Sequence, residues 1–102
     1  MRLRELVAET ALTVRGSSET DVTMIVIDSR RATAGSLFIA IKGIAEDGHD
    51  FLQEAVARGA SALVVEDEAR VPPGFAGPVV VAPNGRVALN RLSGRFFGDP
   101  GE

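Results

Sequence analysis

Short apolar runs alternate with glycine, proline and charged residues along most of the chain. Near its start, Leu6 and Val7 follow Leu3 at the spacing that places all three on one face of a short helix over residues 2–9. The later runs are bounded by turn residues, which indicates strands buried within a sheet. The predicted strands are residues 22–27, 37–41, 62–65 and 79–81, and residues 10–15 form either a short strand or an extended crossing.

The pattern over residues 50–58 predicts a helix with recognisable ends. Asp50 is placed to cap its first turn, and Gln53 completes a capping-box pattern. Gly59 suits the position just after the last turn, where a left-handed backbone conformation is common. The side chains expected on the buried face of this helix are those of Leu52, Ala55 and Val56.

A longer helix is predicted over residues 85–97. Asn84 can cap its first turn. The helix must end before Pro100, because proline cannot continue a helix. The side chains expected to share one face are those of Leu89, Leu92, Ser93 and Phe96.

The order of these elements predicts how the strands pair. The helix over residues 50–58 lies between strands 37–41 and 62–65, which favours a right-handed crossover joining parallel neighbours. The connection from strand 22–27 to strand 37–41 is too short for a crossover helix, so that pair is either an antiparallel hairpin with a wide loop or neighbours in a mixed sheet. We therefore expect an α/β fold in three layers, with a mixed, mostly parallel sheet of about four or five strands and flanking helices.

Composition narrows the class of protein further. A length of 102 residues fits a single domain, and the absence of cysteine excludes a disulfide framework. The formal net charge of −3 argues against nucleic acid as a partner, since phosphate binding favours a basic surface. No apolar run approaches the roughly 20 residues of a membrane span, and the N-terminus lacks the pattern of a secretory signal. These features predict a cytoplasmic domain that binds neither nucleic acid nor membrane.

Candidate binding residues follow two of the predicted strands. Asp28 and Ser29 come directly after strand 22–27, and Lys42 and Gly43 come directly after strand 37–41. Ligands of open α/β folds sit outside strand ends, where backbone N–H groups and short side chains are free. Ser29 could therefore hold a polar ligand, or Asp28 and Ser29 could simply close the turn through bonds to the backbone. A glycine after a buried strand allows close approach of a ligand, although it also suits an ordinary loop.

Two other features do not form a recognisable catalytic site. His49 is the only histidine, and without cysteine or a second histidine it has no obvious partners for a metal site. We therefore interpret it as a residue at the start of a helix. The only lysine, Lys42, precedes its glycine, whereas a phosphate-binding loop requires the order G-x-x-x-x-G-K-[ST].

Taken together, three segments resemble the N-terminal domain of the Mur ligases. They are IDSRRATAGSLFIAIKGIAEDGHDF at residues 27–51, AVARGASALVVE at 55–66 and RVALNRLSGRFFGDP at 86–100. The resemblance covers essentially the whole chain. Within the family the best match is the MurE branch, because the MurF branch tends to carry threonine in place of Ser29 and lacks the Phe-Phe-Gly-Asp-Pro ending.

This resemblance implies a docking role for residues 1–102. In MurE-type ligases the N-terminal domain holds the UDP end of UDP-N-acetylmuramoyl-L-alanyl-D-glutamate, to which the enzyme joins a diamino acid during peptidoglycan synthesis. The family's pattern places no catalytic residue and no metal ligand in this domain. Carried onto this sequence, its nucleotide contacts fall on Ile27, Ser29, Ile44, Ala45 and Glu46.

The resemblance also implies what the chain itself does not contain. In the family, ATP and Mg²⁺ form an acyl phosphate that the amine then attacks, and these steps belong to domains that would follow Glu102. We therefore expect the isolated chain to be inactive as a ligase, and its partners to be a UDP-linked muramoyl peptide and the remaining ligase domains in cis. The alternatives are a MurF-type domain or a stand-alone module that binds a UDP nucleotide.

Overall fold

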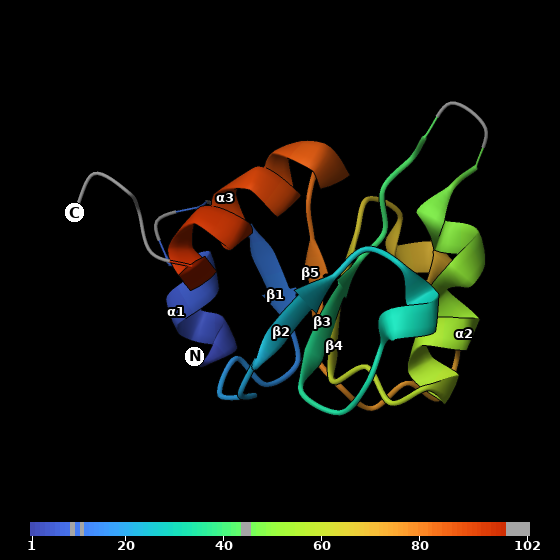
Figure 1. Cartoon of the computed structure of the whole chain (residues 1–102), viewed down its shortest axis with the longest axis horizontal. Helices are drawn as coiled ribbons and strands as arrows, with labels where there is room; N and C mark the ends of the chain where they lie inside the picture. The colour runs from blue at the N-terminus through green and yellow to red at the C-terminus, as the bar shows by residue number, and fades with distance from the viewer. Residues whose placement is uncertain (9, 11, 44–45, 98–102) are drawn as a thin grey trace.

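In the computed structural model, which describes residues 1–8, 10, 12–43 and 46–97, a five-stranded sheet lies between two layers of helices (Figure 1). The strand order is β1-β5-β4-β3-β2. The expected three-layer α/β architecture is therefore confirmed. The strands are β1 Thr13–Arg15, β2 Met24–Val26, β3 Ser36–Ile39, β4 Ala62–Val65 and β5 Val79–Val81.

Four of the strands run parallel, and only β1 is antiparallel to its neighbour, β5. Leu37 of β3 pairs with Ala62 of β4 in a parallel register, which confirms the predicted crossover between these strands. Ile25 of β2 also pairs in parallel with Leu37, so the hairpin alternative for this pair is wrong. A one-turn 3₁₀ helix, η1 (Ser29–Arg31), lies in this short connection and takes the place of a full crossover helix.

Helices cover both faces of the sheet. The short helix α1 (Leu3–Val7) and the long helix α3 (Gly85–Phe97) pack on one face, and α2 (Leu52–Ala57) packs on the other (Figure 1). Asn84 caps α3 as predicted, because its Oδ1 accepts the backbone N–H of Val87 at 3.1 Å. None of the helices in the described part of the chain is long and apolar enough to cross a membrane.

The start of α2 differs from the prediction. A 3₁₀ turn, η2 (Gly48–Phe51), precedes the helix, and the carboxylate of Asp47 caps this turn by accepting the backbone N–H of His49 at 2.9 Å. Asp50 lies inside the 3₁₀ turn and pairs instead with Arg70 of a second such turn, η3 (Glu68–Arg70). The predicted cap at Asp50 is therefore wrong, although Gly59 does end the helix at a positive φ of 105°.

The central strands are buried on both faces, which explains their continuous apolar sequence. Along β3, successive side chains point to opposite faces, so Leu37 and Ile39 enter one core whereas Phe38 enters the other. Leu92 of α3 packs in the first core, and Leu52 of α2 packs in the second. The two cores hold the parallel strands rigidly and so fix the positions from which the loops depart.

Candidate functional site

A cavity of about 470 Å³ opens where β2 and β3 end. Three residues expected to contact a nucleotide, Ile27, Ser29 and Glu46, lie together in its lining. The other two, Ile44 and Ala45, lie outside the described residues. The cavity is lined by Ile27, Asp28, Ser29, Arg30, Glu46, Phe51 and Glu54.

Asp28 fixes the turn that follows β2. Its Oδ1 accepts the backbone N–H of Arg30 at 2.9 Å, and its two oxygens also accept from Nε and Nη2 of the Arg30 guanidinium at 3.1 and 2.8 Å. The hydrogen bond from the Arg30 side chain, followed by that from its backbone, lowers the pKa of Asp28 from 3.8 to about 2. The expectation that Asp28 closes its own turn is thus confirmed, and the same contacts hold a guanidinium at the cavity.

The side chain of Ser29 bonds to a residue of α2 and does not close its own turn. Its side chain is buried, and its hydroxyl donates to Oε1 of Glu54 on α2 rather than to the backbone of its own turn. The turn-closing interpretation is therefore wrong for Ser29. Glu54 is a cavity residue that sequence reasoning missed, because it lies 25 residues after Ser29, in a helix for which the sequence predicted only the buried face.

The loop after β3 is narrow at its base. The backbone N–H of Gly43 donates to the carbonyl of Glu46 at 2.7 Å, and that of Gly48 donates to the carbonyl of Ile41 at 2.8 Å. A Cβ atom on Gly43 would lie 3.0 Å from the Glu46 carbonyl oxygen. Gly43 thus permits the two sides of the loop to approach one another, and this contact positions Glu46 at the cavity.

His49 joins the segment that follows β3 to the loop that follows β4. Its ring is buried, and Nε2 accepts the backbone N–H groups of Glu66 at 3.0 Å and Asp67 at 3.3 Å. The ring hydrogen therefore lies on Nδ1, 2.7 Å from Oδ1 of Asp47. Asp47 also accepts the backbone N–H of His49, which is the main reason that its pKa lies below the ordinary value. These contacts agree with the structural interpretation of His49.

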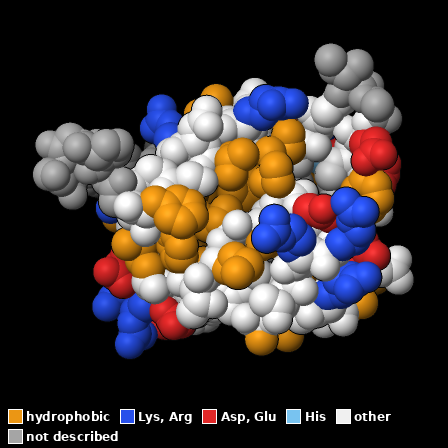
Figure 2. Space-filling model, in the orientation of Figure 1, with side chains coloured by type: hydrophobic (Ala, Val, Ile, Leu, Met, Phe, Trp, Pro, Cys, Tyr) orange, Lys and Arg blue, Asp and Glu red, His pale blue; other side chains and the backbone are white. Residues whose placement is uncertain are grey.

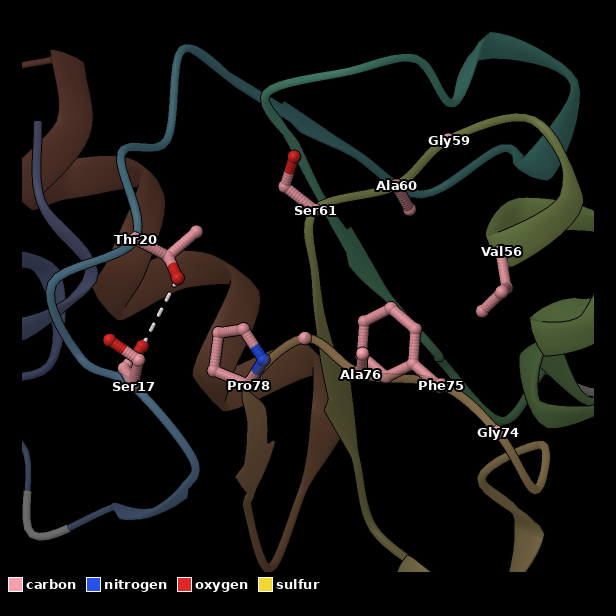
Figure 3. A pocket seen from close by; sticks show the side chains of 11 residues that line it. Ser17, Thr20, Val56, Gly59, Ala60, Ser61, Gly74, Phe75, Ala76 and Pro78 are labelled. Atoms are coloured by element: carbon pink, nitrogen blue, oxygen red, sulfur yellow. Dashed lines mark hydrogen bonds between the residues drawn. The ribbon is translucent and has the colours of Figure 1, made fainter.

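A second cavity, of about 450 Å³, lies at the opposite edge of the sheet, where β4 and β5 begin (Figure 3). Phe75 and Pro78 line it together with Ser17 and Thr20, and the Thr20 hydroxyl donates to the Ser17 carbonyl at 3.2 Å. The described residues that line it include no charged side chain. The cavity beside Ser29, which combines charged, polar and aromatic groups, is chemically better suited to a polar ligand.

Several large hydrophobic side chains are also exposed at the surface. Met24 and Ile27 at β2, together with Val87 and Phe97 of α3, are exposed large hydrophobic residues. Figure 2 shows hydrophobic atoms gathered over these elements, with acidic and basic side chains mixed on the side of α2. Ile27 is one of these exposed hydrophobic residues, with 55% of its surface exposed, and it also lines the first cavity.

Comparison with known proteins identifies close relatives. A family profile described as "Mur ligase family, catalytic domain" matches residues 21–94. The UDP-N-acetylmuramoyl-L-alanyl-D-glutamate--2,6-diaminopimelate ligase of Geobacter sulfurreducens is 40% identical over 98% of this chain. The chain spans only 19% of that relative, and similar shares of other curated relatives.

Solved structures give the same relationship. MurF from Acinetobacter baumannii superposes with a TM-score of 0.76 at 28% identity, covering 92% of this chain and 20% of the MurF chain. The MurF ligase from Thermotoga maritima, solved in complex with ADP, covers 72% of this chain and 16% of its own, with a TM-score of 0.58 and 28% identity. The chain therefore corresponds to a small part of each of these larger proteins.

Proposed function

Because the chain belongs to the Mur ligase family, we propose that it is the domain that docks the UDP end of a UDP-linked muramoyl peptide in an ATP-dependent ligase of the MurE type. The observation that carries the proposal is the cavity at the ends of β2 and β3, where Ile27, Ser29 and Glu46 lie together. In this proposal the parent enzyme acts in the cytoplasm during peptidoglycan synthesis, and the remaining ligase domains lie in cis.

The chemistry of the cavity suits a nucleoside diphosphate. Arg30 carries a guanidinium that can donate to oxygen acceptors of a nucleotide, on its phosphates or on its base, and Asp28 engages only two of its five N–H donors. Phe51 offers an aromatic face on which a base can stack. Both strand ends are held by buried cores, so these groups are positioned before a ligand arrives.

Assignment to the MurE branch rests on the sequence relatives. The Geobacter sulfurreducens relative is 40% identical to the chain, whereas the MurF structures are 28% identical. Ser29 supports the same branch, since threonine is usual there in MurF. A MurF-type domain remains the second candidate, because the fold of this chain superposes well on MurF.

Phosphoryl transfer is not assigned to this chain. The sequence contains no G-x-x-x-x-G-K-[ST] loop, and the amine of Lys42 lies 3.9 Å from Oε1 of Glu66. The residues present therefore do not fit ATP and Mg²⁺ in the way that a phosphate-binding loop would. We propose that the docking domain contributes substrate orientation and that ATP is bound elsewhere in the parent.

Titration of the 102-residue chain with UDP by NMR tests this proposal. We expect weak binding, with a Kd of roughly 10⁻³ to 10⁻⁴ M, because the domain meets only one end of the substrate. Amide shifts should cluster at residues 27–30 and 46–54 and saturate. Saturating UDP that leaves these amides unmoved, or moves those around Pro78 instead, would overturn the assignment of the cavity.

A further inference from the structure

The hydroxyl hydrogen of Ser29 is already committed before any ligand binds. It points to Oε1 of Glu54, whose carboxylate can only accept hydrogen bonds. No other group in the described part of the chain donates to Ser29 Oγ or competes for its hydrogen. The remaining capacity of Ser29 towards the cavity is therefore that of a hydrogen-bond acceptor.

From this arrangement we infer that Glu54 is a positioning residue, which makes Ser29 an acceptor and thereby selects a base with an N–H donor at ring position 3. The inference rests on the proposed docking function and adds a rule of base selection to it. Uracil presents an N3–H donor, whereas cytosine presents a lone pair at the same ring position. A site whose serine can only accept therefore favours a uridine nucleotide over a cytidine nucleotide of nearly the same size.

The residues around Ser29 also suit the other groups on the pairing edge of uracil. A carbonyl oxygen flanks the uracil N3–H, so a matching site needs a donor next to its acceptor. Arg30, the next residue in η1, retains N–H donors after its two bonds to Asp28. Phe51 lines the same cavity and can contact the face of the ring while its edge meets Ser29.

The scaffold fixes Glu54 in the orientation that this role requires. Glu54 lies in the middle of α2, and Oε2 of its carboxylate is 3.6 Å from Nη2 of Arg58 one turn later. The Ser29 bond uses the other oxygen, so the carboxylate bridges η1 and α2. Without the carboxylate, the Ser29 hydroxyl would be free to turn and to donate to a ligand instead.

The test compares the affinities of UDP and CDP for four proteins by NMR titration. The wild-type chain should bind UDP about tenfold more tightly than CDP, since CDP leaves the acceptor at Ser29 facing a lone pair. Ser29→Ala and Glu54→Ala should each reduce this preference to about twofold or less. The matched control is Glu19→Ala, which removes an exposed glutamate that pairs with Arg2 and Arg4 and does not line the cavity; it should keep the full preference.

The outcomes separate this inference from the proposed function. Failure of the wild-type chain to bind UDP would overturn both. Binding of UDP and CDP with equal affinity by the wild type would leave docking intact and overturn the selection rule. Retention of the wild-type preference by a folded Glu54→Ala protein would remove Glu54 from its role. A merely structural contribution of Glu54 would lower both affinities together and leave their ratio unchanged, so the ratio decides the matter even where a variant is less stable.

Discussion

The Nε2 atom of His49 lies 3.0 Å from the backbone nitrogen of Glu66, which donates its hydrogen to the ring. This bond joins the turn that follows β3 to the loop that follows β4. The carboxylate of Glu66 in turn accepts the backbone N–H of Gly85 at 2.7 Å, where α3 begins. A single buried imidazole therefore holds together the loops at the edge of the sheet where the candidate site lies.

Replacing His49 with alanine should destabilise the protein. The substitution leaves the N–H groups of Glu66 and Asp67 without an acceptor in a partly buried position and removes a buried ring. We expect a loss of about 2–3 kcal/mol in the free energy of unfolding, measured by urea denaturation. His49→Gln, which retains an acceptor, should lose less. If His49 instead contacts the nucleotide, the folded alanine variant will bind UDP at least about tenfold more weakly with little change in stability.

The carboxyl group of Asp28 should titrate at an unusually low pH. Its pKa falls from 3.8 to about 2 chiefly because of the side-chain hydrogen bond from Arg30. Since the folded pKa is the lower one, the stability that Asp28 contributes is fully present above pH 3.8 and is lost as the pH falls towards about 2. The stability difference between the wild type and Asp28→Asn should shrink over that interval.

Carboxyl-resolved NMR titration measures the same effect directly. Arg30→Ala should move the Asp28 midpoint part of the way back to 3.8, since the backbone hydrogen bond from residue 30 remains. An Asp28 midpoint near 3.8 in the wild type would show that the Asp28–Arg30 contact does not persist in solution.

Alanine substitutions at two glycines should change the stability of the protein in opposite directions. A Cβ on Gly48 would lie 2.5 Å from the backbone nitrogen of Ile41, so Gly48→Ala must displace the loop at the cavity and should cost about 1–3 kcal/mol. Gly94 in α3 has no atom within 4 Å of the corresponding position, and Gly94→Ala should stabilise the protein by about 0.5–1 kcal/mol. Thermal unfolding of both variants gives the comparison. Equal effects would mean that the close approach at Gly48 is relieved at no cost.

The sequence predicted local features more completely than contacts between distant segments. The strands 62–65 and 79–81 and the helix 85–97 have the predicted bounds, because each is an apolar pattern closed by nearby glycine or proline. The prediction failed at residues 47–50, where Asp47 caps the 3₁₀ turn and Asp50 pairs with Arg70 of η3, 20 residues further along the chain. No local pattern reveals such a pairing.

The candidate site, too, was predicted only in part from the sequence. The polar residues at strand ends, and the family resemblance, pointed to Ile27, Ser29 and Glu46, which the fold does bring together. The hydrogen bond between Ser29 and Glu54 joins a strand end to a helix and has no sequence spacing that marks it. The sequence also left open whether β2 and β3 are parallel, because their connection is too short for a full crossover helix. In the structure a one-turn 3₁₀ helix in this connection is enough to return the chain for parallel pairing.

Ser29→Ala should weaken the binding of UDP without unfolding the protein. The substitution removes one neutral hydrogen bond to the ligand, which corresponds to a loss of about 0.5–1.5 kcal/mol of binding free energy. It also removes the donor to Glu54, but that carboxylate is partly exposed and paired with Arg58, so water can replace the hydroxyl. Ser17→Ala provides the matched control, because Ser17 lines the cavity at the opposite edge of the sheet. Isothermal or NMR titration of both variants should show reduced affinity only for Ser29→Ala. The opposite ranking would place the nucleotide in the other cavity, and a Ser29→Ala variant that loses stability while keeping its affinity would reduce Ser29 to a link between η1 and α2.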